Sequence, residues 1–301
     1  MPKTAVVTDT NSGMTLEEGR KNGIFVLPMP VVIDETEYLE DVDLSHEKFY
    51  DALSSGAHVH TSQPAAGDVM GLWDKVLSEY DEIVHIPMSS GLSGAMQNAR
   101  IYAEDYNGKV QVVDNQRISV TQRQSAYDAK YMSNKGMGAA IIKQRLEESK
   151  FDSSIYIMLD TLEYLKKGGR ITPAAATFAK ILNLKPILQI QGEKLDAFSK
   201  CRGLKQGKSI MLKAVADDAK ERFGGYNPLE PRIWFYVAHT QNEAAAIEFK
   251  KEVIEAFPGA RVELAALPLS IACHIGPGSL AIACAKLLPE GQPYKDKAID
   301  N

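Results

Sequence analysis

Short apolar runs alternate with amphipathic stretches through the first half of the chain. The clearest runs have the length of buried strands and lie at residues 5–7, 83–86 and 110–113. Between them, apolar residues recur with helical spacing, as on the buried face of an amphipathic helix. Strands that alternate with helices indicate parallel βαβ units with right-handed crossovers. We therefore expect helices at residues 15–22, 45–53, 93–106, 121–134 and 138–149, and one more that Thr61 or Ser62 caps and that has Pro64 in its first turn.

The pattern changes after residue 153. Two apolar runs flank Gly192 and Glu193, as in a β-hairpin. A hairpin beside helices indicates an α+β domain with a mixed sheet. We expect strands at residues 155–159, 186–191, 194–199, 231–238 and 261–266, and helices at 161–167, 204–223, 242–256 and 279–288. The predicted fold class is thus α/β with two domains, an N-terminal α/β/α parallel-sheet domain (residues 1–152) and a C-terminal α+β domain with a mixed sheet (residues 153–301).

Composition narrows the function. A chain of 301 residues can bury a sizeable core. A formal net charge of −5, with no concentrated Lys/Arg face, argues against nucleic-acid binding. The three cysteines, Cys201, Cys273 and Cys284, have no CxxC spacing, so we expect neither a disulfide framework nor a cysteine metal site. No apolar run reaches membrane-spanning length and no signal-peptide pattern precedes the first strand, so we expect a cytoplasmic protein.

The loop SSGLSG at residues 89–94 joins an apolar strand to an expected helix that Ser93 would cap. A helix start offers unpaired N–H donors and the positive end of the helix dipole, which favour an anion. The serines add hydroxyl donors, and Gly91 and Gly94 allow a ligand to approach the backbone. The loop has no Lys or Arg and the chain has no GxxxxGK[ST] motif, so a single negative charge suits it better than a polyphosphate. A capped turn without a ligand is an equally good interpretation of this stretch alone.

Two glycine-rich segments in the second half add candidate residues. Gly168 and Gly169 precede Arg170, and the sequence HIGPGS begins at His274. Taken alone, each has a simpler explanation. The glycine pair can be only a helix C-cap beside a surface arginine, and His274 can be a core histidine with its hydrogen bonds satisfied.

Together these motifs resemble the DegV family, the bacterial fatty-acid-binding proteins that serve a fatty acid kinase. The resemblance runs from Ala5 to about Leu288, and two segments depart from it. Residues 115–121 lack the expected glycines, and the first loop reads Asp9-Thr10-Asn11-Ser12 where the family more often has Asp-Ser. The motifs that carry the resemblance, in order, are TSQP at 61–64, SSGLSG at 89–94, TLEYLKKGGRI at 161–171, KPIL at 185–188 and GPG at 276–278.

The resemblance implies a long-chain fatty acid held between the two domains, with its chain in a tunnel of the second domain. It implies no cofactor and no catalysis by this chain, because the partner kinase phosphorylates the acid for phospholipid synthesis. Arg170, and more weakly Arg202, would form the rim where the kinase docks. The carboxylate binders would be Thr61, Ser62, Ser93, the Gly94 N–H and, from the second domain, His274. Candidate tunnel residues, at least half of which we expect to be ordinary core, are Ile171, Phe178, Ile181, Leu182, Leu184 and Ile187.

The acyl chain and the carboxylate contribute differently to the free energy of binding. A chain of roughly sixteen carbons gains roughly 0.8 kcal/mol per buried CH₂, a gross term on the order of 10 kcal/mol. Hydrogen bonds to a charged group contribute about 1.5–3 kcal/mol each, and much of this offsets desolvation of the carboxylate. The tail should therefore set the affinity, and the polar residues should set the orientation.

Two other functions compete with the carrier. Residues 91–95, GLSGA, match the GxSxG elbow of a serine hydrolase except at the last position, with His274 as the base. Six residues separate Ile86 from Ser93, however, whereas an elbow nucleophile lies on a tight strand-to-helix turn. A metal site at His58 and His60 is the weaker alternative, since no third ligand is linked to them by a motif.

Overall fold

The computed structural model describes residues 2–169, 184–192 and 194–291. The chain forms two compact units, Met1–Lys150 with Pro268–His274, and Phe151–Leu267 with Ile275–Asn301. The second half of the chain thus contributes one short segment to the first unit. That segment lies within residues 153–301, the range expected for the C-terminal domain.

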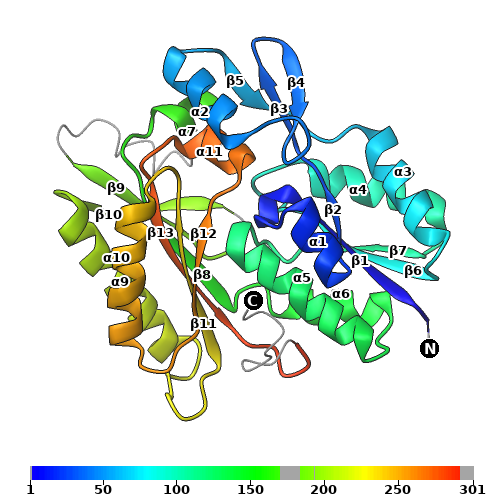
Figure 1. Ribbon diagram of the computed structural model, residues 1–301. Coiled ribbons are helices and arrows are strands. Elements are labelled where there is room, and N and C mark those ends of the chain that lie inside the picture. Colours follow the sequence, from blue (N-terminus) through cyan, green and yellow to red (C-terminus); the bar gives the residue numbers. More distant parts are fainter. Residues whose placement is uncertain (1, 170–183, 193, 292–301) are drawn as a thin grey trace. The chain divides into compact units, whose positions relative to one another are not determined.

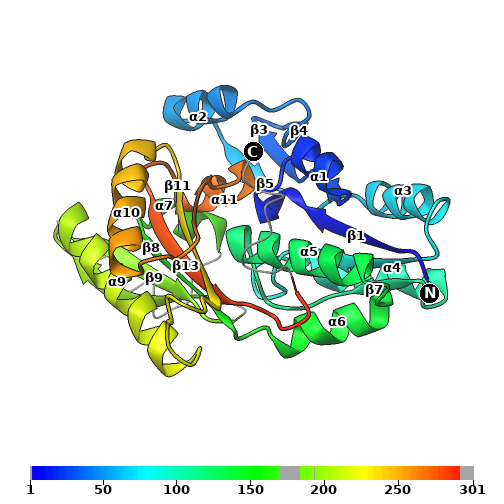
Figure 2. The ribbon, with the colours of Figure 1, turned by 60° about the horizontal axis from the view of Figure 1, so that its bottom comes forward.

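The first unit contains a four-stranded sheet in the order β2-β1-β6-β7. All neighbours in it are parallel, as the βαβ pattern predicts. Helices α3 and α4 pack on one face, and α5 and α6 pack on the other (Figures 1 and 2). The strands are β1 Thr4–Asp9, β2 Phe25–Leu27, β6 Glu82–Ile86 and β7 Val110–Val112. The helices are α1 Leu16–Asn22, α3 Ala66–Leu77, α4 Ala95–Ala103, α5 Ser119–Asn134 and α6 Ala139–Glu148, with 3-10 turns η1 Thr10–Ser12 and η2 Glu104–Tyr106.

A small antiparallel sheet, in the order β4-β3-β5, completes the first unit. Helix α2 (His46–Ser55) and helix α11 (Leu269–Ile275) share an apolar cluster with it. Thr61 is the last residue of β5 and caps no helix, because α3 begins only at Ala66 and has no side-chain cap. The predicted cap at Thr61 or Ser62 is therefore wrong. The strands are β3 Pro30–Ile33, β4 Thr36–Leu39 and β5 Val59–Thr61.

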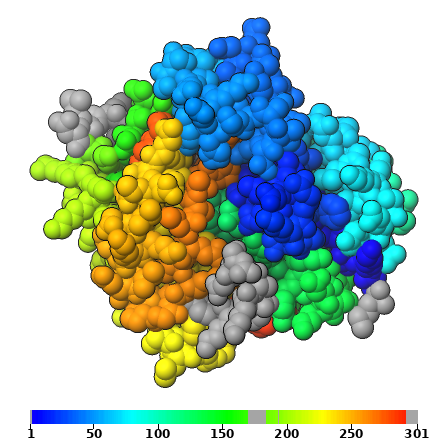
Figure 3. Space-filling view, in the orientation of Figure 1, coloured from blue at the N-terminus to red at the C-terminus, as the bar shows by residue number. Residues whose placement is uncertain are grey.

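The second unit is built on a six-stranded mixed sheet in the order β10-β9-β8-β13-β11-β12. Only the β11–β12 pair is parallel, and the predicted hairpin is confirmed as the antiparallel β9–β10 pair. The outer side of α10 lies open on the face shown in Figure 3. The strands are β8 Ser153–Met158, β9 Lys185–Ile190, β10 Leu195–Cys201, β11 Ile233–His239, β12 Val262–Ala266 and β13 Leu280–Lys286, and the helices are α7 Glu163–Gly168, α9 Leu204–Glu221 and α10 Glu243–Ala256.

Strand β13 overturns the prediction of a helix at residues 279–288. It lies between β8 and β11, and all of its residues before Lys286 are buried. A strand buried on both faces has no polar alternation, so its apolar run cannot be told from a buried helix by periodicity.

Within the described ranges, no helix combines the length and apolar character needed to span a bilayer.

Candidate functional site

Thr61 and His274 meet in the first unit, although 213 residues separate them in the chain. Thr61 ends β5 and His274 lies in the last turn of α11. Thr61 Oγ1 is 2.9 Å from His274 Nε2, and both residues are half-buried. A hydroxyl and an imidazole beside each other provide two hydrogen-bonding groups suited to a carboxylate.

Helix α11 brings His274 to this position by burying its apolar side. Leu269, Ala272 and Cys273 pack with Phe49 and Tyr50 of α2 and with residues of the small sheet. The thiol of Cys273 also donates to the carbonyl oxygen of Val59 at 3.6 Å. His274 therefore belongs to the first unit, which corrects its assignment as a second-domain contact.

Gln63 joins the TSQP motif to the first turns of α4. Its Oε1 accepts from Asn98 Nδ2 at 2.5 Å. A Cβ on Gly94 would lie 2.5 Å from Gln63 Nε2, so only glycine fits there without a shift. Gln63 thus packs the TSQP motif, which includes Thr61, against Gly94. The Thr61–His274 contact then connects the same motif to α11. Membership of the TSQP motif is the one sequence signal that points to Gln63.

Ser62 has a different environment. Its hydroxyl donates to Glu37 Oε2 of β4 at 3.1 Å. A head-group role for Ser62 would require its hydroxyl to leave that carboxylate.

Ser93 stands two residues before α4, which begins at Ala95 with Gly94 at the N-cap position. The expected helix start at Ser93 is thus early, but its Oγ accepts from the Ala95 N–H at 3.2 Å. The loop closes on Ser89, whose carbonyl oxygen accepts from the N–H groups of Leu92 and Ser93 at 3.0 and 3.2 Å.

Asp9 supports this loop from the carboxyl end of β1. Its Oδ2 accepts from the Met88 N–H at 3.1 Å, and its Oδ1 accepts from Gln122 Nε2 at 3.0 Å. Burial raises the pKa of Asp9 to about 6, against the opposing effect of these hydrogen bonds. In the sequence, the polar run at residues 9–12 stands out only as a departure from the family pattern.

Two non-glycine residues within the segment 115–121 have left-handed backbone. Gln116 and Ser119 have φ values of 56° and 54°. The carbonyl oxygen of Arg117 between them accepts from the Ser89 N–H at 2.9 Å. Because left-handed backbone costs roughly 1–2 kcal/mol for a residue with a Cβ, the surrounding contacts must hold it. One such contact is the bond from the Arg117 guanidinium to the Ser149 carbonyl oxygen, at 2.9 Å.

The remaining candidates lie in the second unit. Arg202 is exposed between β10 and α9, and its N–H donates to Gln206 Oε1 at 2.7 Å. Ile187 is fully buried in the core of this unit and Leu184 is half-buried. Arg170 and the tunnel candidates Ile171, Phe178, Ile181 and Leu182 lie outside the described residues.

The GPG motif serves packing inside the second unit. A Cβ on Gly276 would lie 2.4 Å from the Tyr164 ring, and one on Gly278 would lie 2.4 Å from Asp160 Oδ2. The motif therefore packs tightly against the segment that begins the TLEYLKKGGRI motif.

The alternative sites have weaker geometry. The rings of His58 and His60 are 5.0 Å apart, but the described part of the chain contains no group of three or more potential His, Cys, Asp or Glu metal ligands. Seven non-glycine residues of the described chain have a positive φ, and Ser93 is not among them. Helix α4 begins two residues after Ser93. This backbone does not form the strained elbow of a serine hydrolase.

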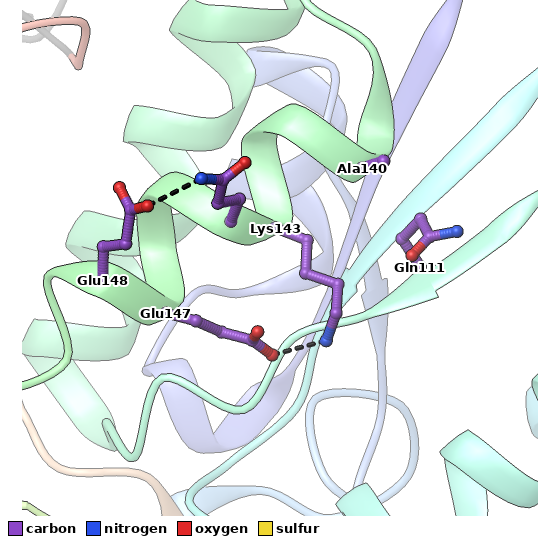
Figure 4. A pocket seen from close by; sticks show the side chains of 6 residues that line it. Gln111, Ala140, Lys143, Glu147 and Glu148 are labelled. Atoms are coloured by element: carbon purple, nitrogen blue, oxygen red, sulfur yellow. Dashed lines mark hydrogen bonds and ion pairs between the residues drawn. The ribbon is translucent and has the colours of Figure 1, made fainter.

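A surface pocket beside α6 differs from the expected apolar tunnel (Figure 4). All of its lining residues except Ala140 have polar or charged side chains, and Lys143 Nζ lies 2.5 Å from Glu147 Oε1 within it. The lining residues are Gln111, Ala140, Lys143, Gln144, Glu147 and Glu148.

The fold and the motif geometry define a two-unit α/β protein with a polar site at strand ends. The sequence model described as "Uncharacterised protein, DegV family" matches residues 3–287. This chain belongs to the DegV family.

Relatives and solved structures agree with this assignment. A DegV domain-containing protein of Listeria monocytogenes is 30% identical over 287 residues, which are 93% of this chain and 97% of that protein. A Thermus thermophilus DegV family structure, described as fatty acid binding, has a TM-score of 0.86 and 28% identity, covering 95% of this chain and 100% of that one. Bacillus subtilis DegV, described as a fatty acid binding protein, has a TM-score of 0.82 and 26% identity, with coverage of 95% and 100%.

Proposed function

We propose that this chain binds a long-chain fatty acid and that Thr61, Ser93, the Gly94 N–H and His274 bind its carboxylate. The observation that carries the proposal is the 2.9 Å pair of Thr61 Oγ1 and His274 Nε2, which unites two residues from separate motifs. The fatty acid binding described for the similar Thermus and Bacillus proteins supports the ligand class.

The electrostatics of the site suit one negative charge. The first turn of α4 presents the positive end of a helix dipole, and the loop before it carries no cation. A carboxylate can accept from the Thr61 hydroxyl and from an N–H group of the His274 ring. A polyphosphate would place more charge there than these groups neutralise.

We further propose that the chain presents the bound acid to a fatty acid kinase for phosphorylation and performs no catalysis itself. The family resemblance and the exposed position of Arg202 support this part. Arg170 and Arg202 are the residues we assign to kinase docking.

The first test asks whether the purified protein carries a fatty acid and whether Ser93 holds it. Organic extraction and mass spectrometry should yield an acyl carboxylate. Ser93→Ala should weaken palmitate binding about tenfold, the factor that corresponds to 1.4 kcal/mol, because it removes a hydroxyl donor and a bond to the Ala95 N–H.

The matched control for this test is Ser54→Ala, which changes an exposed serine of α2. It should bind palmitate like the wild type. Extracts without fatty acid, together with no measurable palmitate binding, would refute the proposed ligand. Unchanged affinity in Ser93→Ala alone would remove only Ser93 from the site.

A further inference from the structure

Glu40 is a buried carboxylate at the start of α11, the helix that carries His274. Its Oε1 accepts from the Leu269 N–H at 2.5 Å, and its Oε2 accepts from Thr10 Oγ1 at 2.9 Å. The Glu40 N–H donates to the Met29 carbonyl oxygen at 3.0 Å, so its own backbone is anchored in the first unit.

Burying this carboxylate costs a large free energy of desolvation. Burial raises the pKa of Glu40 to about 7, and the bonds from Leu269, Thr10 and Ser270 act in the opposite direction. The pKa of Tyr50 of α2 is raised mainly by burial and further by the charge of Glu40. A negative charge at the first turn of a helix is also favourable to the helix dipole.

A second bond holds the same turn of α11. Ser270 Oγ donates to Asn11 Oδ1 at 2.8 Å. The other end of α11 is held by Cys273 at Val59 and by His274 at Thr61. A helix of seven residues is about 10 Å long, so an anchor at its first turn constrains the position of its last turn.

We propose that Glu40 is a positioning residue for His274, which sets through α11 where the imidazole stands beside Thr61. This inference rests on the proposed function of the Thr61–His274 pair. Glu40 acts on the ligand only through α11, so its contribution to fatty-acid affinity should depend on the presence of His274.

A double-mutant cycle on palmitate affinity tests the proposal, using the full chain stripped of lipid. His274→Ala should weaken binding about tenfold and Glu40→Gln about threefold, both within the range of a typical single hydrogen bond. The double variant should bind no more weakly than His274→Ala alone. Glu35→Gln, the same substitution at an exposed turn of the first unit, is the matched control and should change nothing.

A second measurement follows the imidazole directly. The His274 ring protons, assigned by their loss in His274→Ala, should shift in ligand-free Glu40→Gln and Glu40→Asp but not in Glu35→Gln. Glu40→Asp keeps the charge but shortens the side chain, so it should still move α11. Circular dichroism establishes that each variant is folded.

The outcomes separate the two proposals. If His274→Ala binds palmitate like the wild type, the proposed function of the pair fails. If His274→Ala weakens binding while Glu40→Gln has no effect, or has an equal effect in both backgrounds, the positioning role is overturned and the proposed function stands. Unmoved His274 resonances in both Glu40 variants would also overturn the positioning role.

Discussion

At the scale of single residues, a buried polar side chain can belong to the folded core and not to the proposed binding site. His85 of β6 is buried against the edge of the Trp73 ring, with ring centroids 5.4 Å apart. Neither of its ring nitrogens has a hydrogen-bond partner in the described structure. Burial lowers the pKa of His85 to about 3, so the imidazole is neutral in the native protein at pH 7.

We predict that His85→Phe stabilises the protein. Removing an unsatisfied buried polar group should gain roughly 1–2 kcal/mol of unfolding free energy. Unfolded histidine has a pKa of about 6.5, so between that pH and about 3 the unfolded state binds the additional proton. The wild type therefore loses stability as the pH falls through this range, and the variant lacks that loss.

Urea unfolding at pH 7 and pH 5 measures the effect, and the advantage of His85→Phe should be larger at pH 5. His85→Leu gives a smaller apolar alternative if phenylalanine is too large for the core. His60→Gln, at an exposed strand position, is the control and should leave stability unchanged. Equal or lower stability of both His85 variants at both pH values would contradict the prediction.

At the scale of elements, α6 protects the open edge of the parallel sheet. Lys143 Nζ donates to the Val112 carbonyl oxygen at 2.6 Å, and Glu147 Oε1 accepts from the Asp114 N–H at 2.9 Å. These are a carbonyl and an N–H at the edge strand β7, which an added strand could pair with. The side chains of Lys143 and Glu147, shown in Figure 4, thus form the two hydrogen bonds that the backbone of one residue in a neighbouring fifth strand would form.

We predict that Lys143→Ala with Glu147→Ala makes the protein self-associate, because the free edge can then pair with another copy. Sedimentation velocity should show a mass that rises with concentration, and stability should fall by about 1–2 kcal/mol. Gln144→Ala with Glu148→Ala removes a neighbouring hydrogen-bonded pair of α6 and is the control. A monodisperse double variant with wild-type mass would show that these side chains do not protect the edge.

At the scale of the whole molecule, the proposed lipid binding and the proposed transfer to a kinase depend on different residues. The carboxylate binders proposed here lie in the first unit, and Arg202 lies in the second. Substitutions at the proposed docking residues should therefore change transfer to the kinase without changing lipid affinity.

We predict that Arg170→Ala binds palmitate within about twofold of the wild type, far less than the tenfold that corresponds to 1.4 kcal/mol. It should slow phosphorylation of the bound acid by the kinase roughly tenfold, because arginine is enriched among the few interface residues that carry most of the binding free energy. Lys205→Ala, which removes another exposed cation, is the control. Wild-type phosphorylation by Arg170→Ala would contradict the docking role.

The sequence alone determined much of the fold and the position of the polar loops. Apolar runs followed by helical spacing were enough for the parallel strands β1, β6 and β7, because these patterns are local. The same local pattern placed residues 89–94 at a strand end, where α/β sheets bind ligands. The motif order was sufficient to indicate the family that residues 3–287 match.

Only the tertiary structure decided which of these residues meet. Residues Leu280–Lys286 form strand β13 at the centre of a sheet, where both faces are apolar. In such a strand the sequence periodicity does not distinguish strand from helix. Helix α11 joined the first unit because Leu269, Ala272 and Cys273 bury their side chains there. That packing brings His274 to Thr61 and Leu269 to Glu40. Such contacts link residues more than 200 positions apart, and no local pattern specifies them.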